Sequence, residues 1–167
     1  TFIILLAGNL NAGAHAAIQA PSCRTIATNP DVTKGIVLNC LDGKGKFVFQ
    51  ALRGPVILNV WGSWCAPCQD EIPYLRHFYD KYKDKVQLVG LDVEEPNKKV
   101  PQSFIKSNGI TWPSLYDPDG RTRKLIGMGV PVTWFIDSNG KVIHKKIGVF
   151  ANYQELEESA KKYFNLR

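Results

Sequence analysis

Two of the four cysteines, Cys65 and Cys68, are separated by two residues and directly follow an apolar run at 56–61. A strand that ends there in a tight turn places Cys65 at the exposed start of a helix beginning near Pro67. At that point free backbone N–H groups and the helix dipole stabilise a thiolate. Cys68 lies one turn further along and can attack a mixed disulfide formed at Cys65. The spacing therefore predicts a redox pair in which Cys65 is the nucleophile and Cys68 resolves.

A structural zinc site is the main alternative for such a pair. It needs four ligands at close spacing, usually from two C-x-x-C pairs or from one such pair with two histidines. Covalent haem attachment needs a histidine after the second cysteine, and position 69 is Gln. The remaining candidate ligands are scattered along the chain: His15, Cys23, Cys40, His77 and His144. We therefore expect no metal and no cofactor.

The composition suits one globular domain. The chain has 167 residues, of which 44% are hydrophobic and 22% charged, enough for a sizeable core. We predict one domain over 21–167. Residues 1–20 are interpreted as the remnant of an export leader or as a disordered arm, because 2–7 are apolar and 14–16 resemble a signal-peptidase site. An uncleaved anchor is a third interpretation, which would associate the protein with the membrane through its N-terminus. The expected location is the periplasm or the outer face of the cytoplasmic membrane.

Export also bears on the other two cysteines, Cys23 and Cys40. An exported chain with four cysteines can form two disulfides, and these two remain once Cys65 and Cys68 are paired. Such a bond would be structural and would constrain the unfolded chain by about 3 kcal/mol. Lipidation of Cys23 is the alternative, but residues 20–22 are a poor lipidation signal. The disulfide is favoured.

The net charge of +6 raises the question of nucleic-acid binding. The basic residues are scattered, and no basic stripe alternates with aromatic residues. We predict a solvated basic surface, no nucleic-acid partner and a monomer.

The hydrophobic pattern predicts an α/β fold with a central mixed sheet flanked by helices. An apolar run without alternation, as at 56–61, indicates a central strand buried on both faces. A strand, a helix and a second strand in succession imply a right-handed parallel crossover. The expected strands are 36–41, 46–50, 56–61, 86–91, 132–136 and 141–147, of which the first two form an N-terminal hairpin. The expected helices are 67–83, 97–107, 122–126 and 153–164.

With Trp64-Cys-Ala-Pro-Cys68 after the buried strand and Gly-Val-Pro-Val-Thr at 129–133, the chain resembles the thioredoxin fold. More narrowly, it resembles the exported TlpA, ResA and DsbE (CcmG) group of thiol–disulfide oxidoreductases. The extra hairpin, the span 86–113 and Asn59, which stands where cytoplasmic thioredoxin has a buried Asp, support the narrower match. The resemblance covers about residues 36–164.

The resemblance implies roles for four further residues. Glu71, three positions after the second cysteine, would handle protons during exchange, although a helix-start acid favoured by the dipole is the alternative. Pro131 would follow a cis peptide bond and face the cysteine pair, and Val130 would pair with an extended substrate through its backbone. Trp64 would belong to an exposed apolar rim that binds partners.

The group also implies a function: reduction of protein disulfides, with apocytochrome c as the leading substrate and a membrane thiol–disulfide carrier as electron donor. An oxidising, disulfide-forming protein is the first alternative. A peroxidase of the peroxiredoxin class is disfavoured because Gly62 stands where that class has Thr. A copper carrier of the Sco type is disfavoured by the two-residue spacing, although His144 could serve as a distant ligand.

Overall fold

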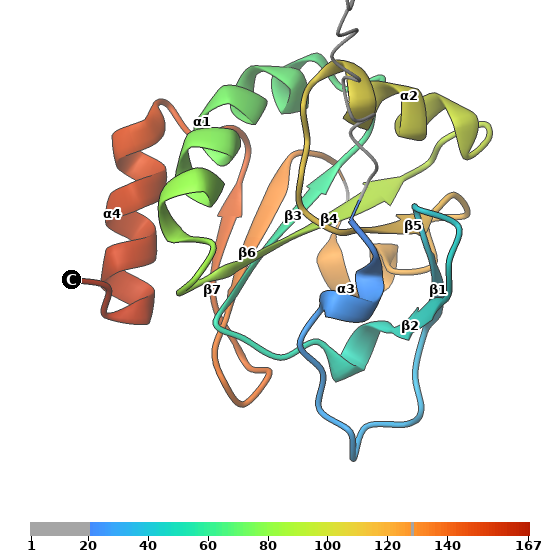
Figure 1. Cartoon of the computed structure of the whole chain (residues 1–167), viewed down its shortest axis with the longest axis horizontal. Helices are drawn as coiled ribbons and strands as arrows, with labels where there is room; N and C mark the ends of the chain where they lie inside the picture. Colours follow the sequence, from blue (N-terminus) through green and yellow to red (C-terminus); the bar gives the residue numbers. More distant parts are fainter. Residues whose placement is uncertain (1–20, 128) are drawn as a thin grey trace, which may run out of the picture.

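The computed structural model describes residues 21–127 and 129–167. The prediction of a leader or arm at 1–20 falls outside these residues. Within them the predicted α/β class, a mixed sheet flanked by helices, is confirmed (Figure 1).

The described strands form one seven-stranded sheet in the order β2-β1-β5-β4-β3-β6-β7. Strand β4 is parallel to β3 and β5, and all other neighbouring pairs are antiparallel. A helix connects the parallel pair β3 and β4, as a crossover between parallel strands requires. The strands are β1 (Val37–Cys40), β2 (Lys46–Val48), β3 (Val56–Trp61), β4 (Gln87–Val93), β5 (Ser114–Asp117), β6 (Val132–Ile136) and β7 (Val142–Ile147).

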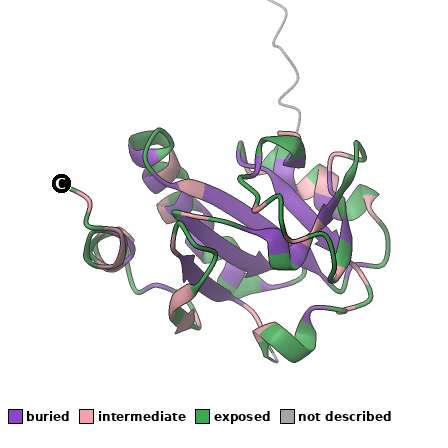
Figure 2. Ribbon diagram, turned by 90° about the horizontal axis from the view of Figure 1, so that it is seen from below, coloured by how far each residue is buried: buried purple, intermediate pink, exposed green. Residues whose placement is uncertain are grey.

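Helices cover both faces of the sheet. On one face α1 (Ala66–Tyr82) and α4 (Tyr153–Phe164) lie side by side, and α2 (Lys99–Ser107) contributes to the same core (Figure 1). The other core holds side chains from η1 (Cys23–Thr25), η2 (Phe49–Ala51) and α3 (Arg123–Ile126). Buried residues accordingly run along the sheet between the two layers (Figure 2).

Strand β3 shows why both faces are apolar. Every one of its residues is buried, and successive side chains of a strand point to opposite faces. Val56, Leu58 and Val60 enter the core beneath η1 and η2, and Ile57 and Trp61 enter the core beneath α1. Asn59 is the one polar residue of the strand, and its position places it on the α1 face.

The strand β5 was not predicted, and two predicted strand ends differ from the structure by two residues. The expected strand at 46–50 ends at Val48, and the chain continues as the short helix η2. The strand expected to end at residue 91 continues through Asp92 to Val93. The sequence signal failed there because an aspartate normally marks the end of a buried strand, whereas Asp92 is itself fully buried.

No helix among the described residues has the length and apolar character needed to cross a membrane.

Candidate active site

Cys65 and Cys68 are joined by a disulfide at the start of α1, with their Cα atoms 5.2 Å apart. Cys65 is the N-cap residue of the helix, and its Sγ accepts a hydrogen bond from the backbone N–H of Cys68 at 3.1 Å. Pro67, whose ring pre-sets a helical φ, stands in the first turn. The helix start therefore places the Cys65 sulfur against unpaired N–H groups.

Exposure of the two cysteines differs from the expectation. Cys65 was expected to be exposed at the helix start, yet both cysteines are only 4% exposed in the disulfide form. The reason is local: the Cys65 sulfur bonds to the first turn of the helix and turns away from solvent. In the oxidised protein the two cysteines are equally buried, so their solvent exposure does not show which of them is the nucleophile.

The loop before the cysteines is held by hydrogen bonds on both sides of Ser63. Its N–H donates to Oε1 of Glu95 at 2.6 Å, and its carbonyl accepts from Nε2 of Gln69 at 2.9 Å. The Cys65 N–H closes the turn by donating to the Gly62 carbonyl at 3.0 Å. Sequence analysis did not find Glu95. The available signal was its position two residues after the end of the buried strand β4.

Trp64 stands beside the nucleophile with 53% of its surface exposed. Its indole N–H donates to the Val93 carbonyl at 3.4 Å. The ring also lies so close to Gly62 that a Cβ at that position would sit 2.6 Å from the indole nitrogen. Glycine at 62 is thus required for this orientation of Trp64.

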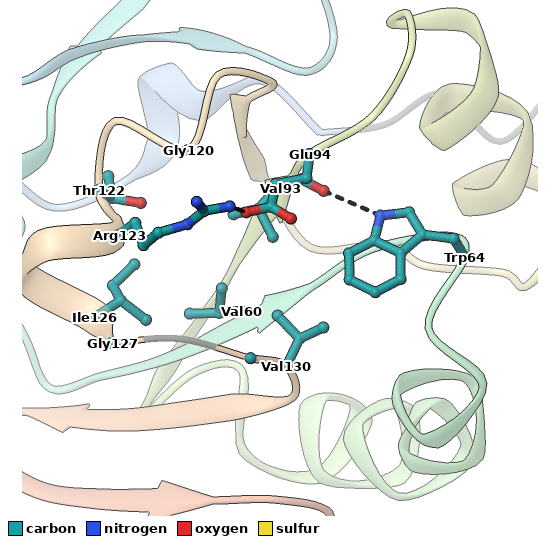
Figure 3. Close-up of a pocket in the computed structure, with 11 residues that line it drawn as sticks. Val60, Trp64, Val93, Glu94, Gly120, Thr122, Arg123, Ile126, Gly127 and Val130 are labelled. Atoms are coloured by element: carbon teal, nitrogen blue, oxygen red, sulfur yellow. Dashed lines mark hydrogen bonds and ion pairs between the residues drawn. The ribbon is translucent and has the colours of Figure 1, made fainter.

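A cleft opens beside Trp64, between the loop before Pro131 and α3 (Figure 3). Its lining is mostly apolar, and an ion pair between Glu94 and Arg123 crosses one side. The apolar lining side chains are Val60, Trp64, Val93, Ile126 and Val130.

The Val130–Pro131 peptide bond is cis, as the resemblance implied. Strand β6 begins directly after it, and Val132 lies opposite Val60 near the end of β3. Since the loop that carries Cys65 follows β3, the loop of Pro131 and the cysteine loop lie at the same end of the sheet.

Glu71 is fully buried under the second turn of α1. Its Oε1 accepts from the Phe150 N–H at 2.8 Å, and its Oε2 accepts from Nδ2 of Asn59 at 3.3 Å. Asn59 also donates to Oγ1 of Thr133 at 3.1 Å. Burial raises the pKa of Glu71 to about 7, against the opposing effect of the hydrogen bonds from Phe150 and Asn59.

Glu71 and Cys68 are three residues apart on α1 and therefore lie on the same side of the helix. Cys68 and Asn59 line one small internal cavity together with Trp61, Ile72, Leu75, Ile110 and Trp112. Asn59 thus contacts Glu71 on one side and the space beside Cys68 on the other.

The second cysteine pair lies on the opposite face of the sheet. Cys23 and Cys40 are joined, with Cα atoms 5.6 Å apart, and both side chains are buried in the core beneath η1. This pair connects η1 to β1, whereas Cys65 and Cys68 belong to the core beneath α1.

Among residues 21–127 and 129–167, no three His, Cys, Asp or Glu side chains gather in a way that could hold a metal ion. His144, the distant ligand that a copper carrier would need, lies on β7, and its ring stacks on Tyr163 with centroids 4.2 Å apart.

The chain is similar in sequence to a known protein family and to curated relatives. A sequence model of the AhpC/TSA family matches residues 30–145, which include Cys65, Cys68, Glu71, Glu95 and Pro131. The thiol-disulfide oxidoreductase ResA of Bacillus thuringiensis subsp. konkukian is 37% identical over 75% of this chain and 73% of that protein. The chain spans 65% of the length of the ResA from Bacillus thuringiensis strain Al Hakam.

Two solved structures are similar to this chain in fold and in sequence. A DsbE-type thiol:disulfide interchange protein from Chlorobium tepidum has a TM-score of 0.64 at 28% identity, covering 76% of this chain and 90% of that one. StoA from Bacillus subtilis has a TM-score of 0.61 at 30% identity, covering 77% of this chain and 98% of that one.

Proposed function

Since this chain belongs to the AhpC/TSA family and is a thiol–disulfide oxidoreductase of the ResA and DsbE type, we propose that it exchanges disulfides with protein cysteines through Cys65 and Cys68. The observation that carries the proposal is the position of the Cys65 sulfur, which accepts the Cys68 N–H at the start of α1. An anionic sulfur at that point gains both a charge-assisted hydrogen bond and the favourable end of the helix dipole.

The reaction of the reduced protein begins at Cys65. Its thiolate attacks one sulfur of a substrate disulfide, a mixed disulfide forms, and the other substrate sulfur leaves as a thiolate. Cys68 then loses its proton, and its thiolate attacks the Cys65 sulfur. The first substrate sulfur leaves as a second thiolate. Two electrons have passed to the substrate, and Cys65–Cys68 remains as a disulfide.

Glu71 is proposed as the group that takes the Cys68 proton. A carboxyl group whose pKa is about 7 is half ionised at neutral pH and can both accept and return a proton there. Its position in the second turn, fully buried, supports this role over that of an acid at the helix start. The proton would cross the small cavity that Cys68 and Asn59 line.

Substrate binding is assigned to Trp64, Val130 and Pro131. Trp64 is exposed, and it lines the cleft together with Val130 (Figure 3). An extended substrate segment laid along the Val130 backbone would place one side chain in the cleft while its cysteine faces Cys65.

The direction of electron flow is proposed to be reducing. Ala66 and Pro67, between the cysteines, supply no side-chain charge or donor that would stabilise a thiolate strongly, and the carboxylate of Glu71 opposes thiolate formation. By resemblance to its group, we further propose a location outside the cytoplasm, a membrane thiol–disulfide carrier as electron source, and apocytochrome c as substrate. The domain 21–167 is proposed to act as a monomer.

The function is tested by mixing reduced protein with insulin and following disulfide reduction in the presence of dithiothreitol. Wild-type protein is expected to accelerate the reaction. Cys65→Ala should not, and Asp84→Asn, a change at an exposed residue, should behave as wild type. Equal rates with wild type and Cys65→Ala would overturn the proposal.

A further inference from the structure

The segment 148–151 connects β7 to α4 (Figure 1) and contacts two parts of the proposed site. Its Gly148 N–H donates to the Pro131 carbonyl at 3.0 Å. Two residues later, the Phe150 N–H donates to Oε1 of Glu71 at 2.8 Å, and Phe150 itself is buried. A displacement of this segment would therefore change the hydrogen bonding of the carboxyl group to which proton handling is assigned.

A second carboxylate, that of Glu155 on α4, accepts the next backbone N–H of the segment. Its Oε2 accepts from the Ala151 N–H at 2.7 Å. The N–H groups of Phe150 and Ala151 belong to the two peptide planes that flank the Phe150 Cα. One plane is bonded to Glu71 on α1 and the other to Glu155 on α4. Because each plane is rigid, fixing the second one also limits where the Phe150 N–H can point.

Lys146 on β7 fixes the other oxygen of Glu155. Its Nζ lies 2.6 Å from Oε1 of Glu155 and 5.7 Å from the centre of the Phe150 ring. The bond from Lys146 holds the pKa of Glu155 below its usual value, so Glu155 is ionised at neutral pH and is a strong acceptor. The two side chains are 28% and 34% exposed, and ion pairs of that kind add little to stability. The main effect of this pair is therefore on the orientation of the Glu155 carboxylate.

The groups that act on Glu71 have effects of opposite sign. Burial raises its pKa, and the hydrogen bonds from Phe150 and Asn59 lower it. The ammonium of Lys146 also lowers the pKa of Glu71, whereas the negative charge of Glu155 raises it. Removing only the charge of Glu155 should therefore lower the pKa of Glu71. Losing the Phe150 bond should raise it, so the two effects can be told apart by their direction.

We propose that Glu155 is a positioning residue for Glu71. By accepting the Ala151 N–H, Glu155 holds the neighbouring Phe150 N–H against the Glu71 carboxylate. This inference rests on the proposed function, in which Glu71 handles protons. The alternative is that Glu155 only interacts with the helix dipole, since it lies in the first turn of α4. In that role it would leave the Phe150 N–H in place, and only its charge would affect Glu71.

The test is a titration of Glu71 in the oxidised protein, whose disulfide-bonded cysteines do not titrate. Protein enriched with ¹³C at its glutamate carboxyl groups is followed by NMR from pH 4 to pH 10, and the Glu71 signal is the one that disappears in Glu71→Gln. The wild-type midpoint is expected at about 7. Glu155→Gln removes the charge but keeps an acceptor oxygen for Ala151, so its midpoint should lie at or slightly below that of wild type.

Glu155→Ala removes the same charge and the acceptor as well. Its midpoint should lie about one pH unit above that of Glu155→Gln, because Glu71 loses a hydrogen bond to its ionised form. The Phe150 amide proton should follow the Glu71 titration in wild type and Glu155→Gln, and much less in Glu155→Ala. Glu158→Gln, at an exposed position of α4, is the control for removal of one charge. If Glu155→Ala does not fold, Glu155→Leu, which also lacks an acceptor, gives the same comparison.

Equal midpoints in Glu155→Ala and Glu155→Gln would overturn the proposal, and so would a Phe150 amide shift that is unchanged in Glu155→Ala. Single-turnover reduction of insulin separates this result from the proposed function. At pH 7 the prereduced Glu155→Ala protein should complete the Cys68 step severalfold more slowly than Glu155→Gln, and the difference should close by pH 9. A raised midpoint without any change in rate would uphold the position of Glu155 and contradict the proton-handling role of Glu71.

Discussion

The carboxylate of Glu71 accepts the backbone N–H of Phe150 at 2.8 Å, although the two residues are 79 positions apart. This bond connects the second turn of α1 to the segment that leads into α4. It also holds this acid of the redox helix in the core, where water cannot stabilise its charge.

Glu71→Gln should change the pH dependence of exchange. In wild type the attack by Cys68 should accelerate as pH rises through about 7, because Glu71 then becomes an ionised proton acceptor. The glutamine variant should lack this step. Single-turnover rates from pH 5 to pH 9 measure it, with Glu158→Gln at an exposed helix position as control. A pH profile identical to that of wild type would contradict the proton-handling role.

Glu71→Gln should also change how the free energy of unfolding depends on pH. The pKa of Glu71 is raised from 4.5 to about 7 on folding, so the folded state holds a proton that the unfolded state releases between these values. Wild-type stability should therefore fall as pH rises from 4.5 to 7, by up to about 3 kcal/mol. Glu71→Gln should lack this loss. Urea unfolding of both proteins at pH 4.5 and pH 7.5 provides the comparison.

Cys68→Ala should accumulate mixed disulfides with substrate proteins, because the attacking sulfur of Cys65 remains and the resolving sulfur is gone. Non-reducing electrophoresis followed by mass spectrometry detects these adducts. Cys65→Ala should not form them. Adducts that appear with Cys65→Ala alone would reverse the two roles.

The Cys23–Cys40 bond is predicted to survive mild reductant that opens Cys65–Cys68. All four cysteines are buried, but the redox pair lies at the start of α1 beside the exposed Trp64, whereas Cys23 and Cys40 lie in the core beneath η1. Peptide mapping after partial reduction measures both bonds. The Cys23→Ala, Cys40→Ala double variant should be less stable by about 3 kcal/mol. A free thiol or a lipid adduct at Cys23 would rule out the pairing.

Trp64→Ala should slow the reaction with protein disulfides more than the reaction with a small aromatic disulfide such as Ellman's reagent. The exposed indole offers contact area to a protein partner that a small reagent does not use. Val100→Ala, at a partly exposed apolar residue of α2, is the matched control. Equal losses with both substrates would indicate that Trp64 acts on Cys65 rather than on partners.

The Cys65–Cys68 couple is expected to have a reduction potential below about −180 mV, the value of protein disulfide isomerase. Equilibration with glutathione buffers and quantification of the disulfide give the value. A potential well above that level would make oxidation of substrates the better assignment.

The sequence predicted six of the seven described strands and the cysteine helix because their signals are local, but it missed β5. The unbroken apolar run of β3 and the spacing of Cys65 and Cys68 need no knowledge of the rest of the chain. Contacts between segments far apart in the chain could not be predicted from the sequence alone. The bonds from Glu71 to Phe150 and from Ser63 to Glu95 depend on how α1, β4 and the segment before α4 meet in space. The buried Asp92 was missed for a related reason, since only the packed sheet shows that this aspartate is covered.

The sulfur of Cys65 is both the reacting atom and the N-cap of α1, so the strength of the helix cap changes with each turnover. A disulfide sulfur is a weak hydrogen-bond acceptor, whereas a thiolate is a strong one. The first turn of α1 should therefore be held more tightly in the reduced protein than in the oxidised one. Amide hydrogen exchange at the Cys68 N–H, which bonds to that sulfur, would record the redox state of the protein as a change in protection.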